Sequence, residues 1–113
     1  MEIQERTVGS VLILDLRGRL ALGDGTGRLK DKVHSVTHEG HRQILLNLAG
    51  VTYVDSSGLG EIVACYTTVV NQGGQIKMVN LTGRVHDLLA ITKLLTVFDT
   101  FDREADAVQS FTS

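Results

Sequence analysis

Cysteine, proline and aromatic residues are scarce in this chain of 113 residues. It has one cysteine, no proline, no tryptophan, two tyrosines and three phenylalanines. The single cysteine, Cys65, excludes an intrachain disulfide and any cysteine-rich zinc site. Because its neighbours are apolar, Cys65 is expected to be a small buried residue rather than a reactive thiol. Without proline, turns must be formed by glycine, asparagine, aspartate and serine.

Long apolar runs and an excess of positive charge are also missing. No apolar run approaches the roughly 18 residues that cross a bilayer, and the first residues have neither a basic start nor an apolar signal segment. A net charge of −2 and the few aromatic rings argue against general nucleic-acid binding. We therefore expect one domain over residues 1–113, without membrane insertion, and take the cytoplasm as its default location.

The first third of the chain predicts a β-hairpin followed by a helix. Residues Ile3–Thr7 and Val11–Arg17 flank Gly9–Ser10, a two-residue turn that commonly joins antiparallel strands. A glycine-rich connection over Leu20–Gly27 then leads into a helix that Gly40 should end. One face of that helix would carry residues at helical spacing: Leu22, Thr26, Leu29, Val33 and Val36.

The middle of the chain predicts a buried strand and a second helix. Gln43–Leu48 is almost entirely apolar, which is typical of a central strand covered on both faces. A helix should follow residue 55 and stop at Gly73–Gly74. Its inward face would hold five residues at helical spacing: Leu59, Ile62, Val63, Tyr66 and Val70.

The last third continues the alternation of strand and helix. Gln75–Leu81 predicts a strand, and Thr82 is a suitable N-cap for the helix after it. A short strand is expected at Val97–Phe98, and Asp102 could cap a last helix. The inward residues of these two helices would be Val85, Leu88 and Leu89, then Ala105, Val108 and Phe111. The order predicts an α/β fold with a mixed central sheet of about four or five strands and about four helices.

The segment Asp55–Gly60, with the sequence Asp-Ser-Ser-Gly-Leu-Gly, stands where the apolar run Ile44–Val54 gives way to a helix. A helix N-terminus presents unpaired N–H groups and the positive end of the macrodipole, so it favours a capping side chain or a phosphate. Asp55, Ser56 or Ser57 could simply be the N-cap. The glycines at 58 and 60 would let another protein approach the backbone closely. The segment is thus a candidate switch site or a plain helix cap.

Enzymatic and ligand-binding alternatives find less support in the sequence. Ser56 lacks the G-x-S-x-G pattern of a hydrolase nucleophile, although four histidines are present. His34 and His38 are four residues apart but lack the zinc-protease pattern, and they suit a solvated helix end. Gly23–Gly27 matches neither common phosphate-binding motif, so a flexible connection is favoured over nucleotide binding. We expect no catalytic activity, no cofactor and no metal.

The whole chain resembles the STAS domain proteins of the anti-sigma factor antagonist family. The opening hairpin, Leu45–Leu48, Val51–Gly60 and Leu81–Leu95 occur in the order typical of that family, and Asp55–Gly60 is the most specific part. The resemblance implies that Ser56, directly after the aspartate, is phosphorylated by a partner anti-sigma factor with serine kinase activity, and that a cognate phosphatase reverses this. The run Gly23–Gly27 has more glycines than the family leads us to expect.

By the same resemblance, the unphosphorylated protein binds the anti-sigma factor and so releases a sigma factor, whereas the phosphorylated protein does not bind. Asp55, Ser57, Gly58 and Leu59 would surround the phosphoacceptor Ser56 on the partner-binding surface. Whether Ser56 or Ser57 takes the phosphate stays open, since either hydroxyl could cap the helix. An alternative is a structural STAS subunit of a membrane transporter or signalling assembly that works without phosphorylation.

Overall fold

The structure is a computed structural model that describes residues 1–23 and 27–111. One sheet has the strand order β1-β2-β3-β4-β5, in which β1 is antiparallel to β2 and the later neighbours are parallel. The strands are β1 (Glu2–Val8), β2 (Val11–Leu20), β3 (Gln43–Val54), β4 (Gln75–Val79) and β5 (Thr100–Phe101). The helices are α1 (Arg28–His38), α2 (Ser56–Asn71), α3 (Gly83–Ile91) and α4 (Glu104–Ser110), with a 3-10 turn at Leu94–Thr96. The predicted α/β fold is confirmed.

The hairpin at the N-terminus forms as its turn residues predict. Val8 pairs with Val11 across the two-residue turn. Gly9 has a φ of 61°, the left-handed conformation that glycine adopts without steric cost and that this turn needs at its first position. The hairpin leaves β1 as one edge of the sheet, next to β2 alone.

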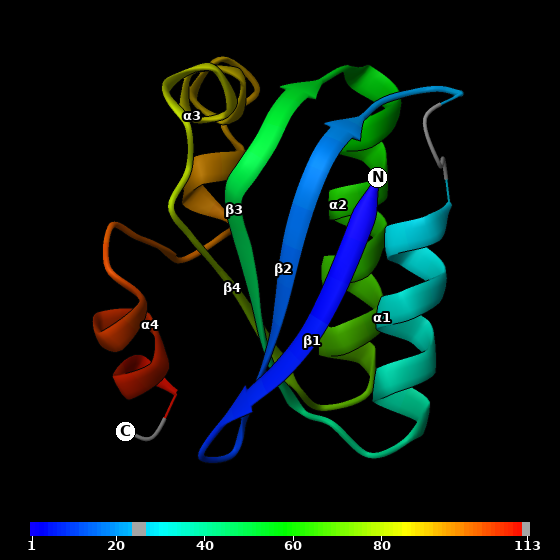
Figure 1. The fold of residues 1–113 in the computed structure, drawn as a ribbon, viewed down its shortest axis with the longest axis vertical. Coiled ribbons are helices and arrows are strands. Elements are labelled where there is room, and N and C mark those ends of the chain that lie inside the picture. Colours follow the sequence, from blue (N-terminus) through cyan, green and yellow to red (C-terminus); the bar gives the residue numbers. More distant parts are fainter. Residues whose placement is uncertain (24–26, 112–113) are drawn as a thin grey trace.

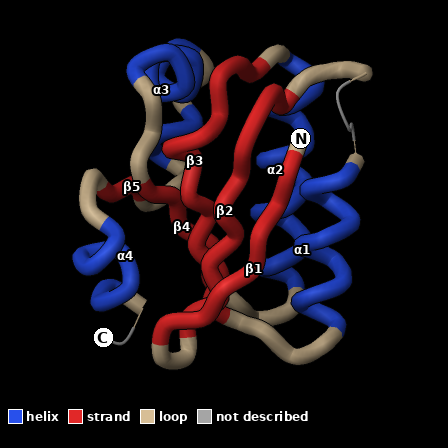
Figure 2. Tube along the Cα trace, viewed as in Figure 1, coloured by secondary structure: helices blue, strands red, loops and turns tan. Residues whose placement is uncertain are grey.

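Helices cover both faces of the sheet, which explains the almost wholly apolar start of β3. Figures 1 and 2 show α1 and α2 side by side on one face, α4 on the other, and α3 at the end where β2 and β3 finish. The larger core lies between the sheet and α1, α2 and α3, and Ile44 and Leu46 belong to it. Leu45 points to the opposite face, into a smaller core closed by Ala107 of α4 and by Phe111, the C-cap of that helix.

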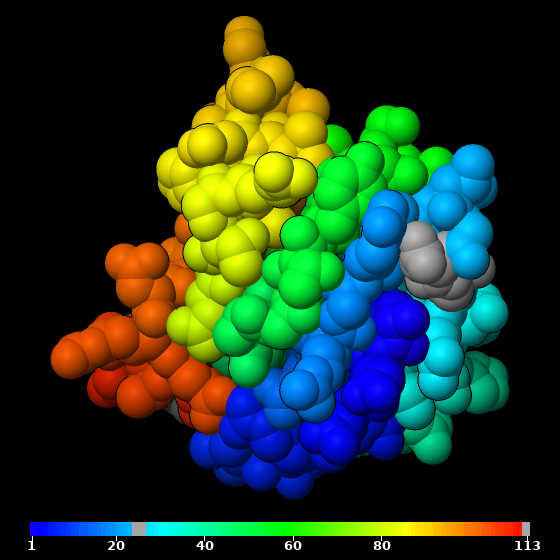
Figure 3. Space-filling model, turned by 45° about the horizontal axis from the view of Figure 1, so that its top comes forward, coloured from blue at the N-terminus to red at the C-terminus, as the bar shows by residue number. Residues whose placement is uncertain are grey.

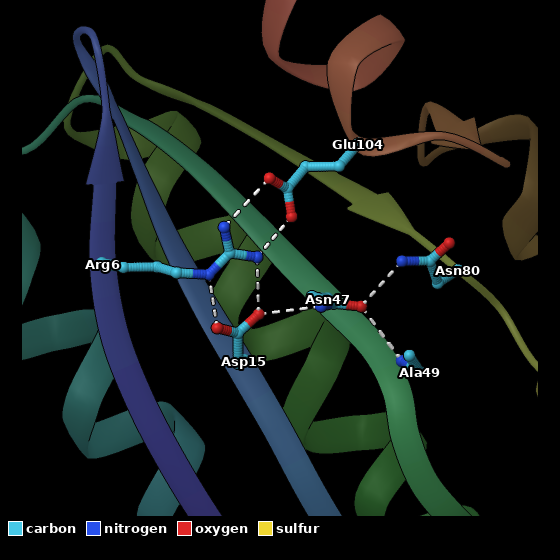
Figure 4. A network of polar contacts seen from close by, with 6 residues as sticks. All are labelled: Arg6, Asp15, Asn47, Ala49, Asn80 and Glu104. Carbon is cyan, nitrogen blue, oxygen red and sulfur yellow. Dashed lines mark hydrogen bonds and ion pairs between the residues drawn. The ribbon is translucent and has the colours of Figure 1, made fainter.

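A polar network ties α4 to the sheet. Arg6 on β1 donates to Asp15 on β2 (Nε to Oδ2, 2.6 Å) and to Glu104 at the start of α4 (Nη1 to Oε2, 2.9 Å). Asn47 donates to the same Asp15 carboxylate over 2.8 Å and accepts from Asn80 over 3.1 Å (Figure 4). The guanidinium of Arg6 lowers the pKa of both Asp15 and Glu104. Three strands, the residue that follows β4 and a helix are thereby joined through one arginine and one asparagine.

Part of the sheet face on the α4 side carries no helix. In the space-filling view of Figure 3, β1, β2 and β3 form an open strip of surface beside α3 and α4. Among the described residues, no helix is long and apolar enough to cross a membrane.

Two expectations for the first two helices are wrong. Leu22 is not on the inward face of α1, because β2 continues to Leu20 and α1 begins only at Arg28, which leaves the Leu22 side chain 72% exposed. Thr26, also placed on that face, lies outside the described residues. In α2, Ile62, Cys65 and Val69 are buried, whereas Val63 and Val70 are exposed at the margin of the apolar face.

The segment before α4 also differs from expectation. Val97–Phe98 is not a strand: the chain turns through a 3-10 helix at Leu94–Thr96, and β5 starts only at Thr100. Phe98 instead packs edge-on against Tyr66, with ring centroids 5.2 Å apart. Asp102 does not cap α4, whose N-cap is Arg103 with no side-chain hydrogen bond. Within α4, Ala107 is buried and Ala105 is exposed, because Ala107 lies on the face that packs against β2 and β3 with Val108 and Phe111.

Candidate functional site

The predicted switch segment lies at the carboxyl ends of the parallel strands, where β3 passes into α2. Asp55 is the N-cap of α2, and its carboxylate accepts a hydrogen bond from the Gly58 N–H over 2.8 Å. Its second oxygen accepts the Leu22 N–H, from the β2–α1 connection, over 3.0 Å. The cap is therefore Asp55, and neither serine fills that position. One carboxylate joins the first turn of α2 to a segment of chain beyond β2.

These two N–H donors fix the charge state of Asp55. The hydrogen bond from Leu22, followed by that from Gly58, lowers the pKa of the Asp55 carboxyl below its usual value, because both bonds favour the ionised form. Asp55 is thus an anion at neutral pH. A permanent negative charge stands immediately before the two serines.

Gly58 is a packing requirement of the same junction. It is buried, and a Cβ atom added to it would come within 1.9 Å of the Leu20 carbonyl oxygen. The Asp55 N–H donates to that same carbonyl over 3.3 Å. The space left by the missing side chain of Gly58 is therefore occupied by the end of β2. Gly60, by contrast, has no atom within 4 Å of an added Cβ and stays accessible.

The two serines have different surroundings. Ser56 is the first residue of α2 and is exposed, whereas Ser57 is half-buried. Ser57 lines a surface hollow of about 280 Å³ between α1 and α2, together with Lys30 and Glu61. Leu59 is half-buried and packs against the larger core. Ser56 therefore offers the more open hydroxyl for contact with another protein.

Glu61 is a residue of this site that the sequence reasoning missed. Its side chain, 7% exposed, lies between α2 and α1 and accepts the Lys30 N–H over 3.0 Å. The N-cap of α1 is Gly27, which has no side chain to bond the first turn, so Glu61 supplies a carboxylate there from the neighbouring helix. The available signal was that Glu61 is the one charged residue between Ser56 and Asn71. A lone acid in an apolar helix is usually paired.

The remaining chemical groups fit structural roles. Cys65 is fully buried, and burial, helped by the negative charge of Glu61, raises the pKa of its thiol to about 12. His34 and His38 are exposed near the end of α1. In the part of the chain that the structure describes, no cluster of three or more His, Cys, Asp or Glu could hold a metal ion. Residues 24–26 of the glycine-rich run lie outside the described residues.

Comparisons with known proteins agree with this geometry. The family model described as STAS domain matches residues 2–107. The anti-sigma-B factor antagonist of Bacillus subtilis is 33% identical over 81 residues, which cover 72% of this chain and 73% of that protein. Similarity therefore extends over most of both sequences.

Solved structures share the fold. A crystal structure from Thermotoga maritima, described as a candidate anti-sigma factor antagonist, superposes with a TM-score of 0.91 at 24% identity and covers 98% of this chain and 95% of that one. The Bacillus cell fate determinant SpoIIAA in its phosphorylated form gives a TM-score of 0.74 at 17% identity, with 96% and 98% covered. At these identities, the likeness concerns the fold alone.

Proposed function

The chain belongs to the STAS domain family, and from this premise we propose that it is an anti-sigma factor antagonist controlled by phosphorylation of Ser56. It acts as a binding protein without catalytic activity of its own, in the cytoplasm. In the unphosphorylated form it binds an anti-sigma factor that has serine kinase activity, and the bound anti-sigma factor releases its sigma factor. A phosphatase restores the binding form.

The observation that carries this proposal is the exposed Ser56 on a fixed helix terminus. Ser56 follows the Asp55 cap, and the cap is bonded to both Gly58 and Leu22. A kinase must bring its active site close to the acceptor hydroxyl, so an exposed serine on a rigid turn suits a substrate. Ser57 is half-buried in the hollow between α1 and α2, so a kinase reaches its hydroxyl less easily, which favours Ser56 as the acceptor.

Phosphorylation at Ser56 would weaken partner binding through charge. A phosphoserine carries about −1.5 to −2 charges at pH 7, and here it would stand next to the ionised Asp55. The helix N-terminus tolerates this charge within the chain itself. Inside an interface, repulsion and desolvation oppose it, and each loss of about 1.4 kcal/mol lowers affinity tenfold.

The test is phosphorylation of the purified protein by the kinase-type anti-sigma factors of its source organism, with ATP, followed by phosphopeptide mass spectrometry. We expect phosphate on Ser56 in the wild type and in Ser57→Ala, and none in Ser56→Ala. Binding measured by calorimetry should be retained in Ser56→Ala and lost in Ser56→Glu. Full phosphorylation of Ser56→Ala, or equal binding by Ser56→Glu, would contradict the assignment. Capture of transporter subunits instead would favour the structural alternative.

A further inference from the structure

Glu61 is a buried carboxylate that uses only part of its capacity to accept hydrogen bonds. Its Oε1 accepts the Lys30 N–H over 3.0 Å, and the residue is 7% exposed. In the part of the chain that the structure describes, no hydrogen bond reaches Oε2 and no ion pair joins Glu61 to a cation, the Lys30 ammonium included. A carboxylate has about four acceptor sites, and a buried charge is usually paired. Glu61 therefore keeps an acceptor that its own chain leaves unused.

The unused oxygen of Glu61 opens into the hollow between α1 and α2. Among the described residues, every enclosed side-chain nitrogen or oxygen has a hydrogen-bond partner, so the unbonded Oε2 is not enclosed and faces the hollow that Glu61 lines. The hollow measures about 280 Å³, and three residues of its wall are small: Gly27, Gly60 and Ala64. A Cβ added to Gly60 would meet nothing within 4 Å. Open space and an unused acceptor thus occur together.

We propose that this hollow receives the guanidinium of an arginine of the anti-sigma factor, and that Glu61 is the residue that selects it. The inference rests on the proposed function, because the hollow adjoins the phosphoacceptor: Ser57, which follows Ser56 in the chain, is part of its wall. A partner that brings its active site to Ser56 also covers this surface. The guanidinium donates N–H groups to Oε2 of Glu61, and the Ser57 hydroxyl is a second acceptor.

The chemistry of the hollow favours a guanidinium over other side chains. An acidic side chain would meet the Glu61 carboxylate, and an apolar one would exclude water from Oε2 without replacing its hydrogen bonds. A guanidinium is planar, carries five donors and is more weakly hydrated than an ammonium, so its transfer into a partly enclosed hollow costs less. Lys30 also lines the hollow, but its side chain is exposed and its flexible stem lets the ammonium turn toward solvent.

The first test uses the protein alone, with methylguanidinium as the probe, and so does not depend on the proposed function. In a titration followed by nitrogen-15 NMR, we expect the Lys30 and Gly60 amide signals of the wild type to shift with probe concentration. The shifts should disappear in Glu61→Gln. Glu39→Gln removes a carboxylate at the exposed C-cap of α1 and should respond like the wild type. Equal shifts in the wild type and Glu61→Gln, or none in the wild type at the highest concentration, would overturn the proposal.

The second test measures affinity for the kinase-type anti-sigma factor by calorimetry without ATP. Glu61→Gln retains an acceptor for the Lys30 N–H and should bind about tenfold more weakly than the wild type, because the charge on the acceptor is lost. Ala64→Leu fills the hollow and should also weaken binding, with urea denaturation confirming that the variant is folded. Lys30→Gln should bind at least as tightly as the wild type, since it removes a like charge near the guanidinium.

Opposite results would separate the two levels of the proposal. Weaker binding by Lys30→Gln together with unchanged binding by Glu61→Gln would identify an acidic partner residue and overturn the arginine. Phosphorylation of Ser56 is measured on the same wild-type sample after ATP is added. Its absence would refute the proposed function and the identity of the partner, whereas its presence with wild-type affinity in Glu61→Gln would refute only the role of Glu61.

Discussion

Helices α1 and α2 each follow a strand and begin at the same end of the sheet, yet their first turns are satisfied differently. In α2 the cap is Asp55, three residues from the Gly58 N–H that it accepts. In α1 the N-cap is Gly27, without a side-chain bond, and the Lys30 N–H is accepted by Glu61, 31 residues away. In both helices the unpaired N–H groups of the first turn need an acceptor. In α2 this acceptor is local, whereas in α1 it comes from the neighbouring helix.

The comparison also shows how the two termini are coupled. Asp55 bonds its own helix and also the Leu22 N–H, which lies on the connection leading to α1. Glu61 belongs to α2 but acts on the first turn of α1. Asp55 therefore holds the connection between β2 and α1 against α2, and Glu61 holds the first turn of α1 against α2. The exposed Ser56 lies at a helix terminus whose neighbouring segments are held together by hydrogen bonds to the Asp55 and Glu61 carboxylates.

The largest expected effect comes from Gly58→Ala, which would push the first turn of α2 away from the end of β2. The new methyl group would lie 1.9 Å from the Leu20 carbonyl oxygen, and backbone on both sides must shift to admit it. We expect a loss of about 3 kcal/mol or more in the free energy of unfolding, measured by urea denaturation.

Gly60→Ala is the matched control for that substitution. Gly60 lies in the same helix with nothing within 4 Å of an added Cβ, so the change should stabilise the protein by about 0.5–1 kcal/mol through helix propensity. Similar losses in the two variants would show that crowding against Leu20 is not the cause.

A second prediction concerns Glu61, which accepts a hydrogen bond from the first turn of α1 although it belongs to α2. Glu61→Ala removes the carboxylate from the first turn of α1 and should cost about 1–2 kcal/mol in urea denaturation. Hydrogen exchange at the Lys30 amide should become faster, while exchange in the first turn of α2 changes little. Glu61→Gln keeps an acceptor and should lose less. Equal losses in the two Glu61 variants would mean that packing, and not the cap, sets the effect.

The third prediction uses pH to measure the contribution that the Asp55 carboxylate makes to stability as the N-cap of α2. The folded pKa of Asp55 is lowered, so its ionised cap contributes stability above the unfolded carboxyl pKa of about 4 and loses it as pH falls through the folded value. Asp55→Asn should therefore be less stable than the wild type at neutral pH, with a difference that shrinks in acid. Asp15 and Glu104, whose pKa values are also lowered, titrate alike in both proteins and so do not contribute to the difference in stability between them. A difference independent of pH would refute the role of charge.

The smallest effect is expected for Leu22→Ala. The Leu22 side chain is 72% exposed and its backbone N–H, which the substitution retains, makes the bond to Asp55. The free energy of unfolding should change by less than about 0.5 kcal/mol in urea denaturation. A larger loss would indicate that the side chain, and not only the backbone, connects β2 to α2.

Patterns that repeat within a few residues predicted the fold well. The Gly9 turn, the apolar run of β3, the burial of Cys65 and the Thr82 cap of α3 are all confirmed. Boundaries near the glycine-rich connection and before α4 were wrong, since Leu22 and Val97 are apolar but exposed. Apolar residues follow helical or strand periods only within an element, and these two lie in connections.

For the candidate site, the sequence by itself determined the strand-to-helix junction, the acidic and hydroxyl residues on it and the family resemblance. These follow from local chemistry, because caps, turns and periodic faces involve residues a few positions apart. The tertiary structure alone decided that Asp55 also bonds Leu22, that Gly58 accommodates Leu20 and that Glu61 serves α1. Each of these depends on two segments brought together by the sheet, and no spacing along the chain encodes such contacts.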